Sequence, residues 1–198
     1  GRDAARKEAS KLNVPRIGVR FRLPASMNQV EYFGRGPAEN YLDRNAGSMV
    51  GLYKSTAEEL YFPYVRPQEN GHHTDTRWVS LSTGKKGLLI QADNTIGFNA
   101  LRNSIEDFDD EEATGLSRQW SNFTPEQVAN HDEAAAKNVL RRQHHINDIT
   151  PRDFVEVCVD LKQQGVAGYD SWGSRPEPAY TLPANREYNW GFTLIPLK

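Results

Sequence analysis

Short stretches of the chain alternate between apolar and polar residues. In residues 16–23 every second residue is apolar, namely Ile17, Val19, Phe21 and Leu23. A period of two residues predicts a β-strand with one face buried and the other exposed to solvent. Pro24 follows, and it is expected to end this strand.

The same period recurs further along the chain. It predicts strands at residues 29–33, 77–83, 87–92, 96–100, 154–161 and 188–195. The turn Thr83-Gly84-Lys85-Lys86 is typical of a hairpin between two of them. In residues 154–161 three valines and one leucine form one face of the predicted strand. Glu156, Cys158 and Asp160 form the opposite face. Many short strands joined by Gly- and Pro-rich turns predict an all-β sandwich or barrel.

A helix is predicted near residues 125–142, with Thr124 as its N-cap and Pro125 at its first position. Val128, Asp132, Ala135 and Val139 follow at steps of four, three and four, a narrow stripe that suits a peripheral helix docked on a sheet. Residues 1–13 are charged and without a clear period, so we expect an arm or linker there. Residues 14–198 are expected to form the domain.

Composition and charge narrow the function classes. The chain has 198 residues, 26 acidic against 24 basic, a net charge of −2 and one cysteine. We therefore expect no nucleic-acid partner, no internal disulfide and no cysteine-based zinc site. No run of 18 apolar residues occurs, so no membrane partner is expected. The first residue is Gly1 and no apolar signal core follows, so we expect a segment of a longer protein and leave the compartment open.

His72, His73 and Asp75 occupy one Gly-flanked stretch and could in principle hold a metal ion. Adjacent side chains of an extended segment point to opposite sides, so only one histidine could share a site with Asp75. A surface or hydrogen-bonded loop is the favoured interpretation, and no metal site is expected. Cys158 lies within a predicted strand and is not expected to be a nucleophile.

Four carboxylates lie in turns, and two of them could in principle serve a glycosidase: Glu39, Asp43, Glu69 and Asp75. A retaining glycosidase needs two carboxylates about 5–5.5 Å apart around the bond that it cleaves. Sequence spacing does not place these four together. Turn caps and salt bridges are the favoured interpretation.

The stretch from Gly168 to Pro176 places Trp172 between a serine and a glycine, outside any predicted strand. Such a tryptophan either anchors its loop or displays its ring to a ligand. Indole rings stack on the apolar face of a pyranose, and Asp or Arg side chains hydrogen-bond sugar hydroxyls. The residues alone leave both interpretations open.

Four ordered segments together resemble one family. They are residues 30–44 (VEYFGRGPAENYLDR), 64–71 with 75–78 (YVRPQENG and DTRW), 151–154 (PRDF) and 168–172 (GYDSW). They are similar to motifs of the C-terminal β-sandwich domain, or small chain, of large bacterial β-galactosidases of glycoside hydrolase family 2. The resemblance covers about residues 14–198.

The resemblance implies a galactose-mutarotase-like supersandwich of two large antiparallel sheets. It implies that the catalytic glutamates, Mg²⁺ and a monovalent cation of the parent enzyme lie outside this chain, which carries no cofactor and is inactive alone. The implied partners are a galactoside, held with the TIM-barrel domain of the same parent chain, and further copies in a homo-oligomer.

The resemblance also implies site residues. Trp172 would form an aromatic wall beside the sugar, with Tyr169 and Asp170 next to it and Asn70, Asp75 and Arg77 as a second group. Relatives often carry two adjacent acids where this chain has Tyr169-Asp170, so we expect Tyr169 to extend the aromatic surface. The segment 121–145 is longer than usual and is expected to be a peripheral insertion or a contact with a neighbouring domain.

Three functions remain to be compared. The leading expectation is a non-catalytic domain of a β-galactosidase, an enzyme that hydrolyses terminal β-D-galactosides such as lactose. A second is a free-standing aldose mutarotase or epimerase that uses Glu69 or Asp75 with His72 or His73 as acid and base. A third is a purely structural assembly domain with Trp172 in an interface.

Overall fold

The computed structural model describes residues 12–65, 67–108, 146–170 and 173–198. The expected helix near 125–142, most of the expected arm 1–13, and Trp172 lie outside the described residues. The chain divides into two compact units. The first comprises residues 1–62, 70–102 and 153–198, and the second comprises residues 63–69 and 103–152. In the described part no helix combines the length and apolar character needed to cross a membrane.

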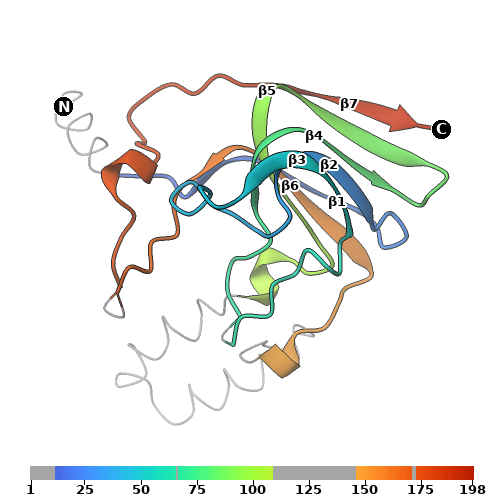
Figure 1. The fold of residues 1–198 in the computed structure, drawn as a ribbon, viewed down its shortest axis with the longest axis horizontal. Coiled ribbons are helices and arrows are strands. Elements are labelled where there is room, and N and C mark those ends of the chain that lie inside the picture. Colours follow the sequence, from blue (N-terminus) through green and yellow to red (C-terminus); the bar gives the residue numbers. More distant parts are fainter. Residues whose placement is uncertain (1–11, 66, 109–145, 171–172) are drawn as a thin grey trace, which may run out of the picture. The chain divides into compact units, whose positions relative to one another are not determined.

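Seven strands of the first unit form one antiparallel sheet (Figure 1). They are β1 (Arg16–Pro24), β2 (Gln29–Gly36), β3 (Met49–Thr56), β4 (His73–Ser82), β5 (Gly87–Leu101), β6 (Phe154–Gln163) and β7 (Phe192–Leu197). Their order is β1-β6-β5-β4-β2-β3, and β7 pairs with the first part of β5. The all-β, antiparallel prediction is therefore confirmed.

The strand boundaries differ most clearly from the predicted ones in four places. The last strand, β7, begins at Phe192 and ends at Leu197, whereas residues 188–195 were predicted. β3 was not predicted, because its sequence MVGLYKST lacks a sustained alternation. β4 begins at His73 rather than residue 77, since register shifts near Thr76 interrupt the period. β5 runs unbroken from residue 87 to 101, where two separate strands were predicted.

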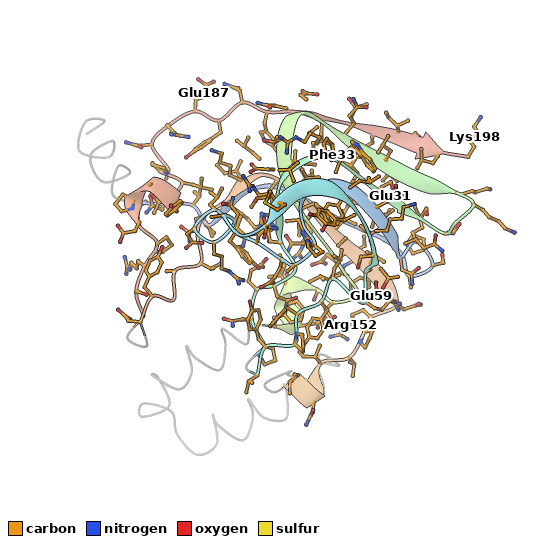
Figure 2. The ribbon with its side chains drawn as sticks, in the orientation of Figure 1. Glu31, Phe33, Glu59, Arg152, Glu187 and Lys198 are labelled. Atoms are coloured by element: carbon orange, nitrogen blue, oxygen red, sulfur yellow. The ribbon has the colours of Figure 1, made fainter. Side chains whose placement is uncertain are left out.

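The two faces of the sheet differ in burial. On one face Tyr32 lies opposite Val79, which lies opposite Ile90, and all three are at most 1% exposed. On the other face lies Phe33 of β2, which Figure 2 labels. Phe33 lies opposite Leu52, and these side chains are 38% and 58% exposed. Among the described residues, the sheet thus buries one face and leaves apolar side chains of β2 and β3 open to solvent.

The polar face of β6 is buried, which corrects the prediction that this strand has one wet face. Glu156, Cys158 and Asp160 are all less than 5% exposed. β6 lies between β1 and β5, and arginines of β1 neutralise its carboxylates. The Arg22 Nε donates to Glu156 at 3.0 Å, and the Arg16 guanidinium pairs with Asp160. A buried charge is tolerated when it is paired in this way.

A hydrogen-bonded network extends from Asp160 into the core. The Arg16 Nη2 also donates to the Asn99 side-chain oxygen at 2.9 Å, and the His72 Nδ1 donates to the same oxygen at 2.8 Å. Gly18 lies opposite Asp160 in the register, and a Cβ atom there would be 2.0 Å from a carboxylate oxygen. The absence of a side chain at residue 18 therefore makes room for the buried carboxylate.

His72 and His73 are buried rather than on the surface, which corrects one part of the sequence interpretation. Their exposed fractions are 1% and 0%. His72 stacks on Tyr41, and His73 stacks on Phe98 and donates to the Arg35 carbonyl at 3.1 Å. Burial lowers the pKa of His72 to about 3 and that of His73 to about 4. Both rings are therefore neutral at pH 7.

The second unit is held by a buried ion pair. The guanidinium of Arg152 pairs with Asp107, which is 4% exposed and lies in the short 3-10 helix η1 (Ile105–Asp107). The same carboxylate accepts the Ser104 N–H at 2.9 Å. The Asn103 side chain donates to the Thr150 carbonyl at 2.8 Å. The segment Pro151-Arg152-Asp153-Phe154 thus contributes a structural arginine.

Replacing Asp160 with alanine should cost about 3–5 kcal/mol of unfolding free energy, because Arg16 is then left part-buried without its carboxylate. Urea denaturation of the chain measures this. Glu31→Ala is the control, since Glu31 pairs with the exposed Lys54 and should cost less than about 1 kcal/mol. Equal losses in the two variants would contradict the buried network.

The buried histidines should make stability fall in mild acid. Their folded-state pKa values lie below the unfolded value of about 6.5, so the unfolded chain binds more protons below that pH. The stability is complete above pH 6.5 and decreases as pH falls toward 4 for His73 and 3 for His72. At pH 5 the loss is on the order of 2 kcal/mol per histidine. Urea denaturation at pH 7 and 5 tests this, and His73→Phe should reduce the difference by about half.

Candidate functional site

The loop that joins β2 to β3, residues 37–48, organises the candidate site. Its Asn40 is fully buried, and its side-chain oxygen accepts the Thr74 N–H at 2.9 Å and hydroxyl at 2.6 Å. The Asn40 amide nitrogen donates to the carbonyls of Arg35 and Ala38, both at 3.1 Å. Asn40 therefore fixes this loop to the start of β4.

Glu39 is bound within the same loop and its surroundings. Its side chain is 4% exposed, pairs with Arg44, and accepts the N–H of Gly71. The Arg44 guanidinium lies 4.8 Å from the centre of the Tyr41 ring. Glu39 therefore serves as the turn cap and salt bridge that the sequence favoured for these carboxylates.

Asp75 and Arg77 lie together at the start of β4. The Arg35 Nε donates to the Asp75 carboxylate, and the Arg35 Nη1 donates to the Ser48 carbonyl at 2.8 Å. Arg77 donates to the backbone oxygen of Asp75, and its guanidinium lies 5.7 Å from the ring centre of Phe33. The Asp75 side chain remains 39% exposed, so this corner can still present polar groups to a ligand.

Asn70 is separated from solvent, unlike Asp75. Its exposed fraction is 2%, and its side-chain oxygen accepts the Phe62 N–H at 3.1 Å. Its carbonyl accepts the amide of Asn99 at 2.8 Å. These contacts give Asn70 a structural role at the tight turn before β4.

Tyr169 and Asp170 lie on an exposed segment that follows β6. Tyr169 is 56% exposed and its N–H donates to the Ser174 hydroxyl at 3.0 Å. The Asp43 carboxylate accepts the Ala167 N–H at 2.7 Å and the Tyr169 hydroxyl at 3.5 Å. Desolvation, and then the negative charge of Asp43, raise the pKa of the Tyr169 phenol. The loop 37–48 therefore contacts the segment that carries Tyr169 and Asp170.

A small, solvent-open hollow of about 40 Å³ lies where these elements meet. Leu42 of the loop, Asp75 of β4 and Lys162 and Gln163 of β6 line it. It lies beside the stem of the Tyr169 segment, because Gln163 directly precedes residues 164–169. The structure thus places Asp75 near the base of that segment, whereas Trp172 lies outside the described residues.

The acid–base pair that a mutarotase would need gains no support from this geometry. His72 and His73 are buried and neutral, and Asp75 is paired with Arg35. Cys158 is a buried free thiol. The described ranges contain no group of three His, Cys, Asp or Glu side chains arranged to hold a metal ion.

Sequence reasoning did not assign Asn40, Arg35 or Asp43 to the site, although all three fall within the first family motif. Asp43 was considered only as a candidate glycosidase carboxylate. The sequence signal that could have identified these three residues is the high density of polar residues between Arg35 and Asn45. Their partners lie 2 to 126 residues away in the sequence, and only the fold identifies the distant ones.

Comparisons with known proteins identify the family of this chain. A family model described as the β-galactosidase small chain matches residues 3–194. A β-galactosidase of Priestia megaterium is 35% identical over 185 residues, which are 93% of this chain and 15% of that protein. One from Arthrobacter sp. is 40% identical over 111 residues, covering 53% and 11%, and one from Vibrio cholerae is 29% identical over 181 residues, covering 91% and 14%.

The chain spans about one seventh of the length of these relatives. The match begins near the first residue and ends four residues before the last, so it includes the loop 37–48, the start of β4 and the Tyr169 segment. The chain belongs to the β-galactosidase small chain family.

Proposed function

We propose that this chain is a non-catalytic C-terminal domain of a β-galactosidase, and that it adds an aromatic wall to an active site completed by a TIM-barrel domain. The observation that carries the proposal is the exposed segment ending in Tyr169-Asp170, which leads directly to Trp172. This segment emerges beside a small hollow lined by polar and apolar residues. The carboxylate of Glu39 is engaged in an ion pair within the domain, which fits a structural role for this residue.

In this proposal the chain binds and orients the sugar and breaks no bond. The indole of Trp172 stacks on the C–H face of the incoming galactoside or of the glucose of lactose, and Tyr169 widens that surface. Asp170, and at the neighbouring corner Asp75 and Arg77, hydrogen-bond hydroxyl groups. Such contacts lower KM and hold the glycosidic bond in position for acid and nucleophile. The glutamates, Mg²⁺ and a monovalent cation are proposed to belong to the barrel.

The same proposal includes a role in assembly. The exposed apolar side chains of β2 and β3, Phe33 and Leu52 among them, form the kind of surface that packs against another element. We propose that this face packs against a second antiparallel sheet in a supersandwich. The assembled enzyme is proposed to be a homo-oligomer that hydrolyses terminal β-D-galactosides.

Trp172→Leu in the assembled β-galactosidase should raise KM for lactose about tenfold, which corresponds to about 1.4 kcal/mol of lost binding. The value of kcat should change less than threefold, because the variant removes no group that transfers protons. Steady-state kinetics with lactose and a nitrophenyl galactoside measure both. Trp190→Leu is the matched control, since Trp190 packs on Phe192 beside β7.

The oligomeric state of each variant, measured by light scattering, distinguishes the roles. Loss of assembly in Trp172→Leu with an unchanged KM would overturn the aromatic wall and support a purely structural domain. An unchanged assembly with a raised KM supports the proposal.

A further inference from the structure

Asp43 connects two parts of the chain that are far apart in the sequence. Its Oδ2 accepts the N–H of Ala167 at 2.7 Å and the hydroxyl of Tyr169 at 3.5 Å, across separations of 124 and 126 residues. We propose that Asp43 is a positioning residue that fixes the backbone from which the sugar-facing Tyr169-Asp170 segment projects. This inference rests on the proposed function and deepens it.

Gly165 makes the approach of the Asp43 carboxylate possible. A Cβ atom on Gly165 would lie 2.5 Å from both the Cγ and the Oδ2 of Asp43, closer than unbonded heavy atoms can come. The Gly165 N–H donates to the Tyr180 carbonyl at 2.8 Å, so the backbone under the carboxylate is itself fixed. The carboxylate therefore lies directly on the chain just before Ala167.

The backbone at Ala167 needs the support that Asp43 gives. Ala167 has a φ of +55° and Gly168 a φ of +84°, so two consecutive residues are left-handed. This conformation is unfavourable for a residue with a Cβ atom. A hydrogen bond from its N–H to an ionised carboxylate is stronger than one to a neutral acceptor. Asp43 thus stabilises the reversal that directs Tyr169 outward.

One further hydrogen bond extends this effect to the exposed residues. The Tyr169 N–H donates to the Ser174 hydroxyl, which joins the two ends of the stretch from Tyr169 to Ser174. The Asp43 Oδ1 is buried and has no hydrogen-bond partner among the described residues. Among the described residues, no donor outside the segment 167–169 binds the Asp43 carboxylate. The Asp43 side chain therefore fixes the position of the backbone just before Asp170.

Asp43→Ala in the assembled enzyme should raise KM for lactose about three- to tenfold and change kcat with a nitrophenyl galactoside less than twofold. Asp43→Asn keeps an acceptor oxygen for Ala167 and should recover part of the lost affinity. A merely structural role would lower thermal stability without this split between KM and kcat.

Gly165→Ala tests the same contact without removing the carboxylate, because the added methyl group displaces Asp43. It should raise KM as Asp43→Ala does. Asp93→Ala is the matched control: the Asp93 carboxylate also lies over a glycine, Gly191, but beside β7. It should leave KM unchanged.

A readout independent of activity is the amide spectrum of the 198-residue chain. Asp43→Ala and Gly165→Ala should shift the amide signals of Ala167 and Tyr169, whereas Asp93→Ala should not. If Trp172→Leu raises KM but neither Asp43→Ala nor Gly165→Ala does, the positioning role is wrong and the proposed function stands. If the amides shift and none of these variants raises KM, the proposed function fails and the positioning role for sugar binding fails with it.

Discussion

The ion pair between Arg16 and Asp160 is the constraint on which the sheet depends. Asp160 is 1% exposed and lies on a strand with neighbours on both sides, so its charge requires a partner inside the sheet. Arg16 supplies that partner and also binds Asn99, which in turn holds His72 and the backbone of Asn70. A single buried charge thus fixes the relative register of β1, β5 and β6 and the turn before β4.

That turn leads directly to the candidate site. Asn40 and Glu39 attach the loop 37–48 to residues 71–74, and Arg35 attaches it to Asp75. Leu42 of this loop lines the hollow. Asp43 of the same loop binds the segment that follows β6. The site is therefore built on loops, but each loop is bound by buried or part-buried hydrogen bonds to the sheet. Such fixed loops suit a surface that binds a ligand with little loss of conformational entropy.

The sequence predicted the strands best where one face is buried and the other is wet. β2 shows this alternation in burial, and both β1 and β2 begin at the predicted residue. The pattern missed β3, which has apolar residues on its exposed side, and at β6 it predicted the strand but not the burial of its carboxylates. Burial of Glu156 and Asp160 depends on arginines more than 130 residues away, which no local pattern contains. The same reason applies to Asp43, whose partner follows 124 residues later.

The position of β1 at the end of the sheet has a consequence for synthesis on the ribosome. Within the part of the chain that the structure describes, β1 pairs with β6 alone, and Arg16 precedes Asp160 by 144 residues. The ribosome therefore completes β1 long before its partner strand leaves the exit tunnel. Until then Ile17, Phe21 and Leu23 have no strand to pair with, although β2 to β5 can already form hairpins. During synthesis, β1 can therefore pair with β6 only after residues 154–163 have left the exit tunnel.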